Sequence, residues 1–149
     1  MMMDYSDNLL RGISVDEWIC DDLVTAAAFQ IKFEEPFLRN GCAAQSICWE
    51  DDASVIEVML QQKKDGHFQF RAGIARLQRE AIDRIIKQPS FSGILSYDRE
   101  PLDNNPYHGN VLISPASSKT QRRLLPAVIA SNVLDIIYRG LGKKVKSET

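Results

Sequence analysis

Apolar and polar residues follow two different periods along this chain, and each change of period divides it into elements. From Phe68 to Leu77, apolar residues alternate with polar or small ones, a period of two typical of a strand with one buried face. The shorter runs Leu9–Ile13, Phe91–Tyr97 and Asn110–Ile113 are also typical of strands. We therefore expect a small sheet of mostly antiparallel strands.

Helical spacing appears in three other segments: residues 51–66, residues 79–87 and residues 124–138, the last with a broad apolar face. Pro126 lacks the amide hydrogen that a helix interior requires, so it either kinks this last helix or begins a second one. Three Ser-x-x-Glu or Ser-x-x-Gln pairs, the spacing of a capping box, mark expected helix starts at Ser14 and Glu17, Ser54 and Glu57, and Ser118 and Gln121.

The predicted fold class is α+β: a small, mostly antiparallel sheet with helices packed on one of its faces and a long C-terminal helix. A length of 149 residues suits one domain, and no linker divides it. We assign the domain to residues 1–142 and a basic flexible tail to residues 143–149. Residues 23–33 fit neither period, and residues 34–41 are expected to form a loop.

Composition and charge narrow the classes of function. The net charge of −2 excludes the broad cationic field of a non-specific nucleic-acid binder. Cys20, Cys42 and Cys48 contain no C-x-x-C pair and no accompanying histidine cluster, so we expect reduced thiols, no metal site and no cofactor. The N-terminus has no signal-peptide pattern, and no stretch reaches the ~18 apolar residues of a spanning helix. We expect a cytoplasmic protein with no membrane partner.

His108 is the candidate catalytic residue. Histidine is a common general acid or base in enzymes, and this one lies in a polar segment between two expected strands, with Asn105, Tyr107 and Asn110 nearby. The alternative is that this segment forms a tight turn in which His108 caps backbone groups. No serine or cysteine neighbour supplies a recognisable triad order, and the short motifs of the common enzyme classes are absent.

Other residues are candidates for ligand binding. Arg11 beside Gly12 could approach a phosphate, and Trp18 or Tyr107 could stack on a base, with Asn105 and Asn110 completing the site. The simpler interpretations are core packing for the aromatic residues and solvation for the arginine.

The segment that follows Ser118 is a candidate interaction surface. Positive charges precede an apolar face, and the residues concerned are Arg122, Arg123, Leu124, Ile129, Val133 and Ile137. The apolar face either packs within the domain or contacts a protein partner or a second copy of the chain. The basic residues leave nucleic-acid binding open.

Two short pieces of sequence resemble a group of small uncharacterised bacterial proteins. The first is Arg11-Gly12-Ile13 followed by Trp18 and by residues 24–29; the second is Asn105-Pro106-Tyr107-His108. The resemblance implies a bacterial or phage-related origin and a multi-gene toxin, defence or mobile-element setting, with no activity attached.

Three functions follow as expectations. The first is a non-catalytic binding or accessory subunit of such a bacterial system. The second is a small enzyme or nucleotide-binding protein that uses His108, of the ADP-ribosyltransferase-like or nuclease-like kind. The third is nucleic-acid binding through the basic C-terminal helix.

Overall fold

The computed structural model describes residues 5–61, 70 and 72–138. Its main sheet contains β1 (Asn8–Ile13), β4 (Leu38–Arg39), β5 (Cys42–Trp49), β6 (Gly73–Gln78), β7 (Leu95–Arg99), β8 (His108–Ile113) and β9 (Val133–Ile137). A separate hairpin consists of β2 (Ile19–Cys20) and β3 (Leu23–Val24). The helices are α1 (Ser54–Met59), α2 (Arg79–Lys87) and α3 (Lys119–Ala130), and 3₁₀ turns lie at Asp16–Trp18, Ala26–Phe29 and Pro89–Phe91.

The sheet has β1 near its centre. Its strand order is β7-β8-β5-β1-β6-β9, with β4 pairing with β5 off this path. Every pairing in it is antiparallel. In the described part of the chain this seven-stranded sheet is the dominant element, and the three helices are short.

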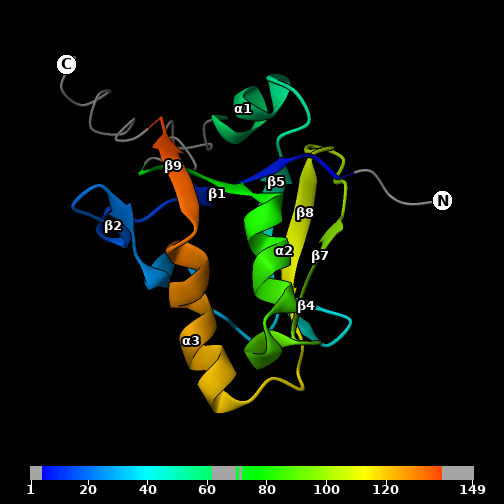
Figure 1. Cartoon of the computed structure of the whole chain (residues 1–149). Helices are drawn as coiled ribbons and strands as arrows, with labels where there is room; N and C mark the ends of the chain where they lie inside the picture. The colour runs from blue at the N-terminus through cyan, green and yellow to red at the C-terminus, as the bar shows by residue number, and fades with distance from the viewer. Residues whose placement is uncertain (1–4, 62–69, 71, 139–149) are drawn as a thin grey trace.

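Both faces of the sheet are covered. Consecutive residues of a strand point to opposite faces, and in β1 the buried Leu9 belongs to the larger core with Ile82 of α2 and Leu125 of α3. Its neighbour Leu10 belongs to a smaller core with Val55 of α1. In Figure 1, α2 and α3 lie together in front of the sheet, whereas α1 lies apart from them at the top. Burying each such aliphatic side chain stabilises the fold by roughly 1.5–3 kcal/mol.

The sheet opens between β1 and β5. One edge of β5 faces β1. Along this edge, residues 48–49 of β5 pair with β1, and residues 42–43 of β5 pair with β4. No described strand pairs with residues 44–47 along this edge. The opening therefore lies in the middle of the sheet and not at its rim.

Arg11 spans this opening. Its Nη1 donates to the carbonyl oxygen of Ser46 at 2.7 Å, and its Nε donates to the carbonyl oxygen of Ala28 at 3.1 Å. A side chain thus satisfies a β5 carbonyl that a neighbouring strand would otherwise satisfy.

The predicted fold class is wrong. The sheet is large, helices cover both of its faces, and the described residues up to 138 do not form the expected long C-terminal helix. The helix is α3, which continues through Pro126 and ends at Ala130. The residues after it form β9, which pairs with β6.

The end of α3 has a physical explanation. The side chains of Ser131 and Asn132 both donate to the carbonyl oxygen of Val128, which has no partner further along the helix. The next five residues include the β-branched Val133, Ile136 and Ile137, which favour an extended backbone. Their apolar spacing fits a helix and a strand alike, so the pattern alone does not separate the two.

Other expectations had mixed outcomes. The helix at Arg79–Lys87 and the capping box at Ser118 and Gln121 are confirmed. The capping boxes at Ser14 and Ser54 are wrong, because these helices begin after Val15 and Ala53 without a side-chain cap. The expected loop at 34–41 contains β4, and β5 was not predicted. The expected helix at 51–66 is shorter than predicted, because α1 ends at Met59. Gly66, part of the strand at 68–77 and the tail at 143–149 lie outside the described residues.

Candidate active site

Two register pairs between β5 and β8 bring four polar residues to one face of the sheet. Ser46 lies opposite Asn110, and Cys48 lies opposite His108. Opposed residues in an antiparallel pair point to the same face, as do residues two apart in one strand. His108 therefore shares a face with Ser46 and Cys48.

The ring of His108 has a defined tautomer. Nδ1 lies 2.9 Å from the carbonyl oxygen of Glu100, and Nε2 lies 3.3 Å from Oγ of Ser46. A carbonyl oxygen can only accept a hydrogen bond, so Nδ1 carries the proton of the neutral ring. Nε2 then presents its lone pair to the Ser46 hydroxyl, which donates. This is the arrangement in which a histidine can remove a proton from a hydroxyl group.

The carboxylate of Glu100 lies on the far side of the same ring. Its Oε1 is 3.5 Å from Nδ1 of His108, and its Oε2 accepts a hydrogen bond from Nε of Arg39 at 2.8 Å. Burial opposes ionisation of Glu100, but the hydrogen bonds from Arg39 and Asn110 outweigh it and lower the pKa of the carboxyl group. Glu100 is thus a stable anion beside the ring nitrogen that carries the proton.

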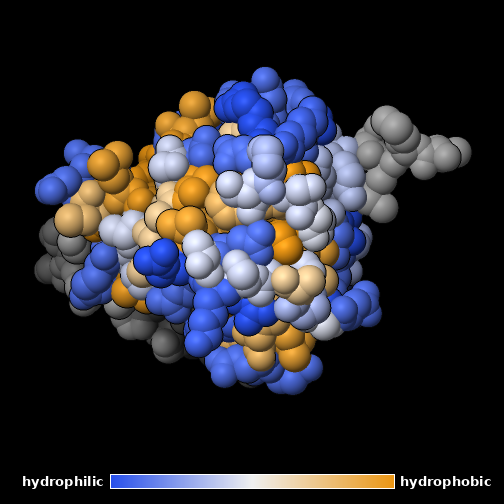
Figure 2. Space-filling view, turned by 60° about the horizontal axis from the view of Figure 1, so that its bottom comes forward, coloured by the Kyte–Doolittle hydropathy of each residue, from blue (hydrophilic) through white to orange (hydrophobic). Residues whose placement is uncertain are grey.

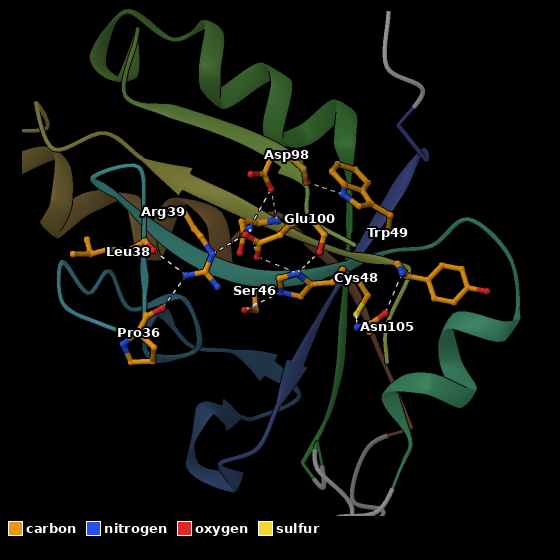
Figure 3. A network of polar contacts seen from close by, with 12 residues as sticks. Pro36, Leu38, Arg39, Ser46, Cys48, Trp49, Asp98, Glu100 and Asn105 are labelled. Carbon is orange, nitrogen blue, oxygen red and sulfur yellow. Dashed lines mark hydrogen bonds and ion pairs between the residues drawn. The ribbon is translucent and has the colours of Figure 1, made fainter. Parts of the chain in front are cut away.

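Arg39 is itself held in place by the backbone of its own turn. Its Nη1 donates to the carbonyl oxygens of Pro36 and Leu38, each at 2.9 Å. Figure 3 shows Arg39 and Glu100 pointing toward one another, with Ser46 and Cys48 projecting from β5 nearby. The chain of contacts therefore runs from Arg39 through Glu100 and His108 to Ser46.

Cys48 is less suited than Ser46 to act as a nucleophile. Its side chain is buried, and its Sγ accepts a hydrogen bond from Nδ2 of Asn105 at 3.2 Å. Burial raises the pKa of the thiol, and the bond from Asn105 offsets this only in part. Cys48 therefore remains a thiol near neutral pH, whereas Ser46 is exposed at the surface of the sheet.

A cavity of about 250 Å³ opens over this constellation. Its polar lining includes Ser46, Cys48, Asn105 and His108, and Met59 and Phe70 are among its apolar walls. The combination of apolar walls and a few convergent polar groups is typical of small-molecule sites. We call this cavity the histidine pocket.

A second cavity, of about 300 Å³, adjoins the first. Gly12, Ser46 and Phe70 line both cavities, and the second adds Arg11 and Lys32. We call this second cavity the basic pocket. It includes residues from both sides of the opening between β1 and β5.

The predicted ligand residues do not line one common cavity. Arg11 and Trp18 line the basic pocket, and Asn105 lines the histidine pocket. Tyr107 lines neither and donates its hydroxyl to Asp52 Oδ1 at 2.9 Å, a bond that raises the pKa of the phenol. Asn110 is fully buried and donates to Asp98 and Glu100, so it supports the site from behind.

The predicted interaction residues also differ in where they lie and in how far they are buried. Ile129 is buried in the chain's own core, and Val133 and Ile137 are half-buried in β9. The guanidinium of Arg122 lies 4.0 Å from the centre of the Phe33 ring and donates hydrogen bonds to Ser117 and Pro115. Arg123 and Leu124 are exposed. The predicted residues therefore do not form a single surface.

Three important residues escaped the sequence analysis: Ser46, Glu100 and Lys32. His108 is 62 residues from Ser46 along the chain, so only the β5–β8 register brings them together. Recognising Cys42–Trp49 as a strand would have shown Ser46 and Cys48 on one face.

Comparison with known proteins gives no further assignment. No family model matches the chain, and neither the curated proteins nor the solved structures contain a match. Within residues 5–61, 70 and 72–138, no helix is both long and apolar enough to span a bilayer. The same residues contain no group of three His, Cys, Asp or Glu side chains arranged to hold a metal ion.

Proposed function

We propose that the protein is a small hydrolase or group-transfer enzyme in which His108 acts as the general base for Ser46. The observation that carries the proposal is the tautomer of His108. The backbone carbonyl of Glu100 holds the proton on Nδ1, so the lone pair of Nε2 is directed at the Ser46 hydroxyl.

The chemistry follows from this geometry. Oγ of Ser46 attacks an electrophilic carbon or phosphorus atom of the substrate as Nε2 of His108 takes its proton. The resulting imidazolium lies beside the Glu100 carboxylate, which stabilises the positive charge. The bond to the leaving group then breaks, and His108 returns the proton to that group. Water or a second substrate, activated by the same histidine, releases the product from Ser46.

This proposal is tested without knowing the substrate. A fluorophosphonate probe phosphonylates activated serines, and intact-protein mass spectrometry with peptide mapping reports which residue is modified. We expect labelling of Ser46 in the wild-type protein, none in Ser46→Ala, and a labelling rate at least 100-fold lower in His108→Asn, since general base catalysis contributes about 10²–10⁴-fold.

A matched control is Ser96→Ala, which removes another exposed strand serine, on β7. Its labelling rate should equal that of the wild type. Equal labelling of Ser46 in wild type and His108→Asn, or no labelling of Ser46 between pH 6 and pH 9, would contradict the proposed role.

A non-catalytic accessory subunit is the second proposal, and one observation favours it. Leu23 and Leu134 are 70% and 56% exposed, and both line a cavity of about 480 Å³ between the β2–β3 hairpin, α3 and β9. Figure 2 shows hydrophobic residues reaching the surface in separate patches and not as one broad face. A stoichiometric partner retained by the wild type and lost from Leu134→Glu would support this function.

A further inference from the structure

We propose that the basic pocket binds the phosphate group of the substrate and that Trp18 stacks on an aromatic ring of the same molecule, which makes the substrate a nucleotide-like phosphate ester. The reacting end of that molecule would lie in the histidine pocket, and this last point rests on the proposed function.

Charge is the first argument. Arg11 and Lys32 line the basic pocket, and none of its described lining residues is an aspartate or a glutamate. Among the described residues, neither cation forms an ion pair with a carboxylate. The pocket therefore has a net positive charge that an anion would neutralise.

The environment of Arg11 is the second argument. Among the described residues, the acceptors of its guanidinium are two neutral carbonyl oxygens, those of Ala28 and Ser46. Burial lowers the pKa of Arg11 to about 10, so the side chain remains charged at neutral pH. Arg11 is half-buried, a partly desolvated charge without a counter-charge is costly, and a bound phosphate would offset that cost.

The third argument is the aromatic surface beside these cations. Trp18 is half-buried and lines the pocket together with Phe37. Nζ of Lys32 lies 4.8 Å from the centre of the Phe37 ring, a contact that holds the ammonium group near the pocket. Aromatic faces bind the rings of bases with little sequence preference, at about 1–3 kcal/mol for each base.

Continuity with the histidine pocket is the fourth argument. Gly12 and Ser46 line both cavities, so the two cavities meet at these residues. A ligand whose phosphate lies against Arg11 and Lys32 can therefore extend across Ser46 without leaving the opening between β1 and β5. One molecule could contact the cations and the nucleophile together.

The experiment measures binding by isothermal titration calorimetry. Ser46→Ala protein is used, so that the probe is not consumed, and the probes are ADP, inorganic pyrophosphate and adenosine. We expect ADP to bind most tightly, pyrophosphate less tightly and adenosine weakest. In the Ser46→Ala protein, the further substitution Lys32→Ala should weaken ADP binding at least tenfold. The further substitution Lys87→Ala, which removes an exposed lysine of α2, should leave ADP binding unchanged.

Two outcomes would overturn the inference: no binding of ADP or pyrophosphate at millimolar concentration, or equal ADP affinity in the Lys32→Ala and Lys87→Ala proteins. The result is separable from that of the labelling experiment. Phosphate binding without labelling of Ser46 would refute the catalytic proposal alone, and labelling without phosphate binding would refute only the assignment of the basic pocket.

Discussion

The indole of Trp49 in β5 reaches across β8 to donate a hydrogen bond from Nε1 to the carbonyl oxygen of Asp98 in β7, at 2.9 Å. Gly109 of β8 lies directly under this bond. A Cβ atom at position 109 would lie 2.3 Å from the Asp98 oxygen and 2.5 Å from Nε1 of Trp49. The bond therefore requires a residue without a side chain at position 109.

Gly109→Ala should consequently destabilise the protein by about 3 kcal/mol, at the upper end of the cost of overpacking, because both obstructing atoms are held within the sheet. Urea unfolding followed by tryptophan fluorescence measures this change. Ser96→Ala on the exposed face of β7 is the control, expected within about 0.5 kcal/mol of the wild type. An equally small effect of Gly109→Ala would show that the indole can leave its position at little cost.

Gly12→Ala should alter both pockets while leaving the chain folded. The Phe70 ring covers Gly12 so closely that a Cβ atom would lie 2.3 Å from Cδ1 of that ring. Since the obstruction is a side chain, the ring can move, and we expect a stability loss of about 1 kcal/mol with at least tenfold slower labelling of Ser46.

A double-mutant cycle tests this cause. If displacement of the Phe70 ring is responsible, Gly12→Ala should have no further effect on labelling in a Phe70→Ala background. An undiminished effect in that background would mean that the added methyl group acts on Ser46 directly.

Leu125→Ala and Leu124→Ala form a matched pair on α3. Leu125 is 0% exposed and Leu124 is 44% exposed. We expect Leu125→Ala to lower the free energy of unfolding by about 2–5 kcal/mol, because it leaves a cavity in the larger core, and Leu124→Ala to lower it by less than about 1 kcal/mol. Calorimetric or urea unfolding of both variants measures these two changes in the free energy of unfolding. Similar losses at the two positions would contradict the orientation of the helix.

Asp51 should make part of the stability depend on pH. Its carboxylate accepts two hydrogen bonds from Arg99, at 2.7 Å and 2.9 Å, and one from Ser6. The hydrogen bonds from Arg99 are the main reason that the pKa of Asp51 is lowered, with burial opposing them. The stabilisation is therefore fully present above the unfolded-state pKa of about 3.9 and is lost as the pH falls through the lower folded-state value.

Asp51→Asn should accordingly lower the free energy of unfolding by about 1 kcal/mol at pH 7. The gap between variant and wild type should stay constant down to about pH 4 and close below it. Asp103→Asn, at an exposed loop position, is the control with no expected change. A gap that persists at pH 2 would mean that the asparagine acts through geometry and not through lost charge.

The local features that sequence could predict depend on neighbours along the chain. Arg79–Lys87 has helical spacing over its whole length, and the Ser118–Gln121 capping box is complete within four residues, so both were predictable. His108 was chosen as a candidate from its residue type; its expected place in a loop was wrong, because it is the first residue of β8 and is buried.

The features that escaped prediction depend on distant parts of the chain. The burial of β5 alternates from Cys42 to Ile47, but one buried position is the polar Gln45 and alanines stand on both faces, so the hydropathy of the sequence does not show this alternation. β9 is a strand because β6 offers it a pairing edge, a condition that residues 133–137 do not reveal by themselves. Ser46 joins His108 only through the β5–β8 register, and Glu100 joins it only through the β7–β8 pairing, in which the Glu100 amide donates to the His108 carbonyl oxygen.

The central position of β1 has a consequence for synthesis. Its two hydrogen-bonding neighbours, β5 and β6, leave the ribosome after it, about 35 and 65 residues later. During that interval Leu9, Leu10 and Ile13 have no sheet to pack against, and pairings between segments so far apart in sequence form slowly. The nascent chain therefore passes through a stage in which residues 8–13 are an apolar segment without a pairing strand.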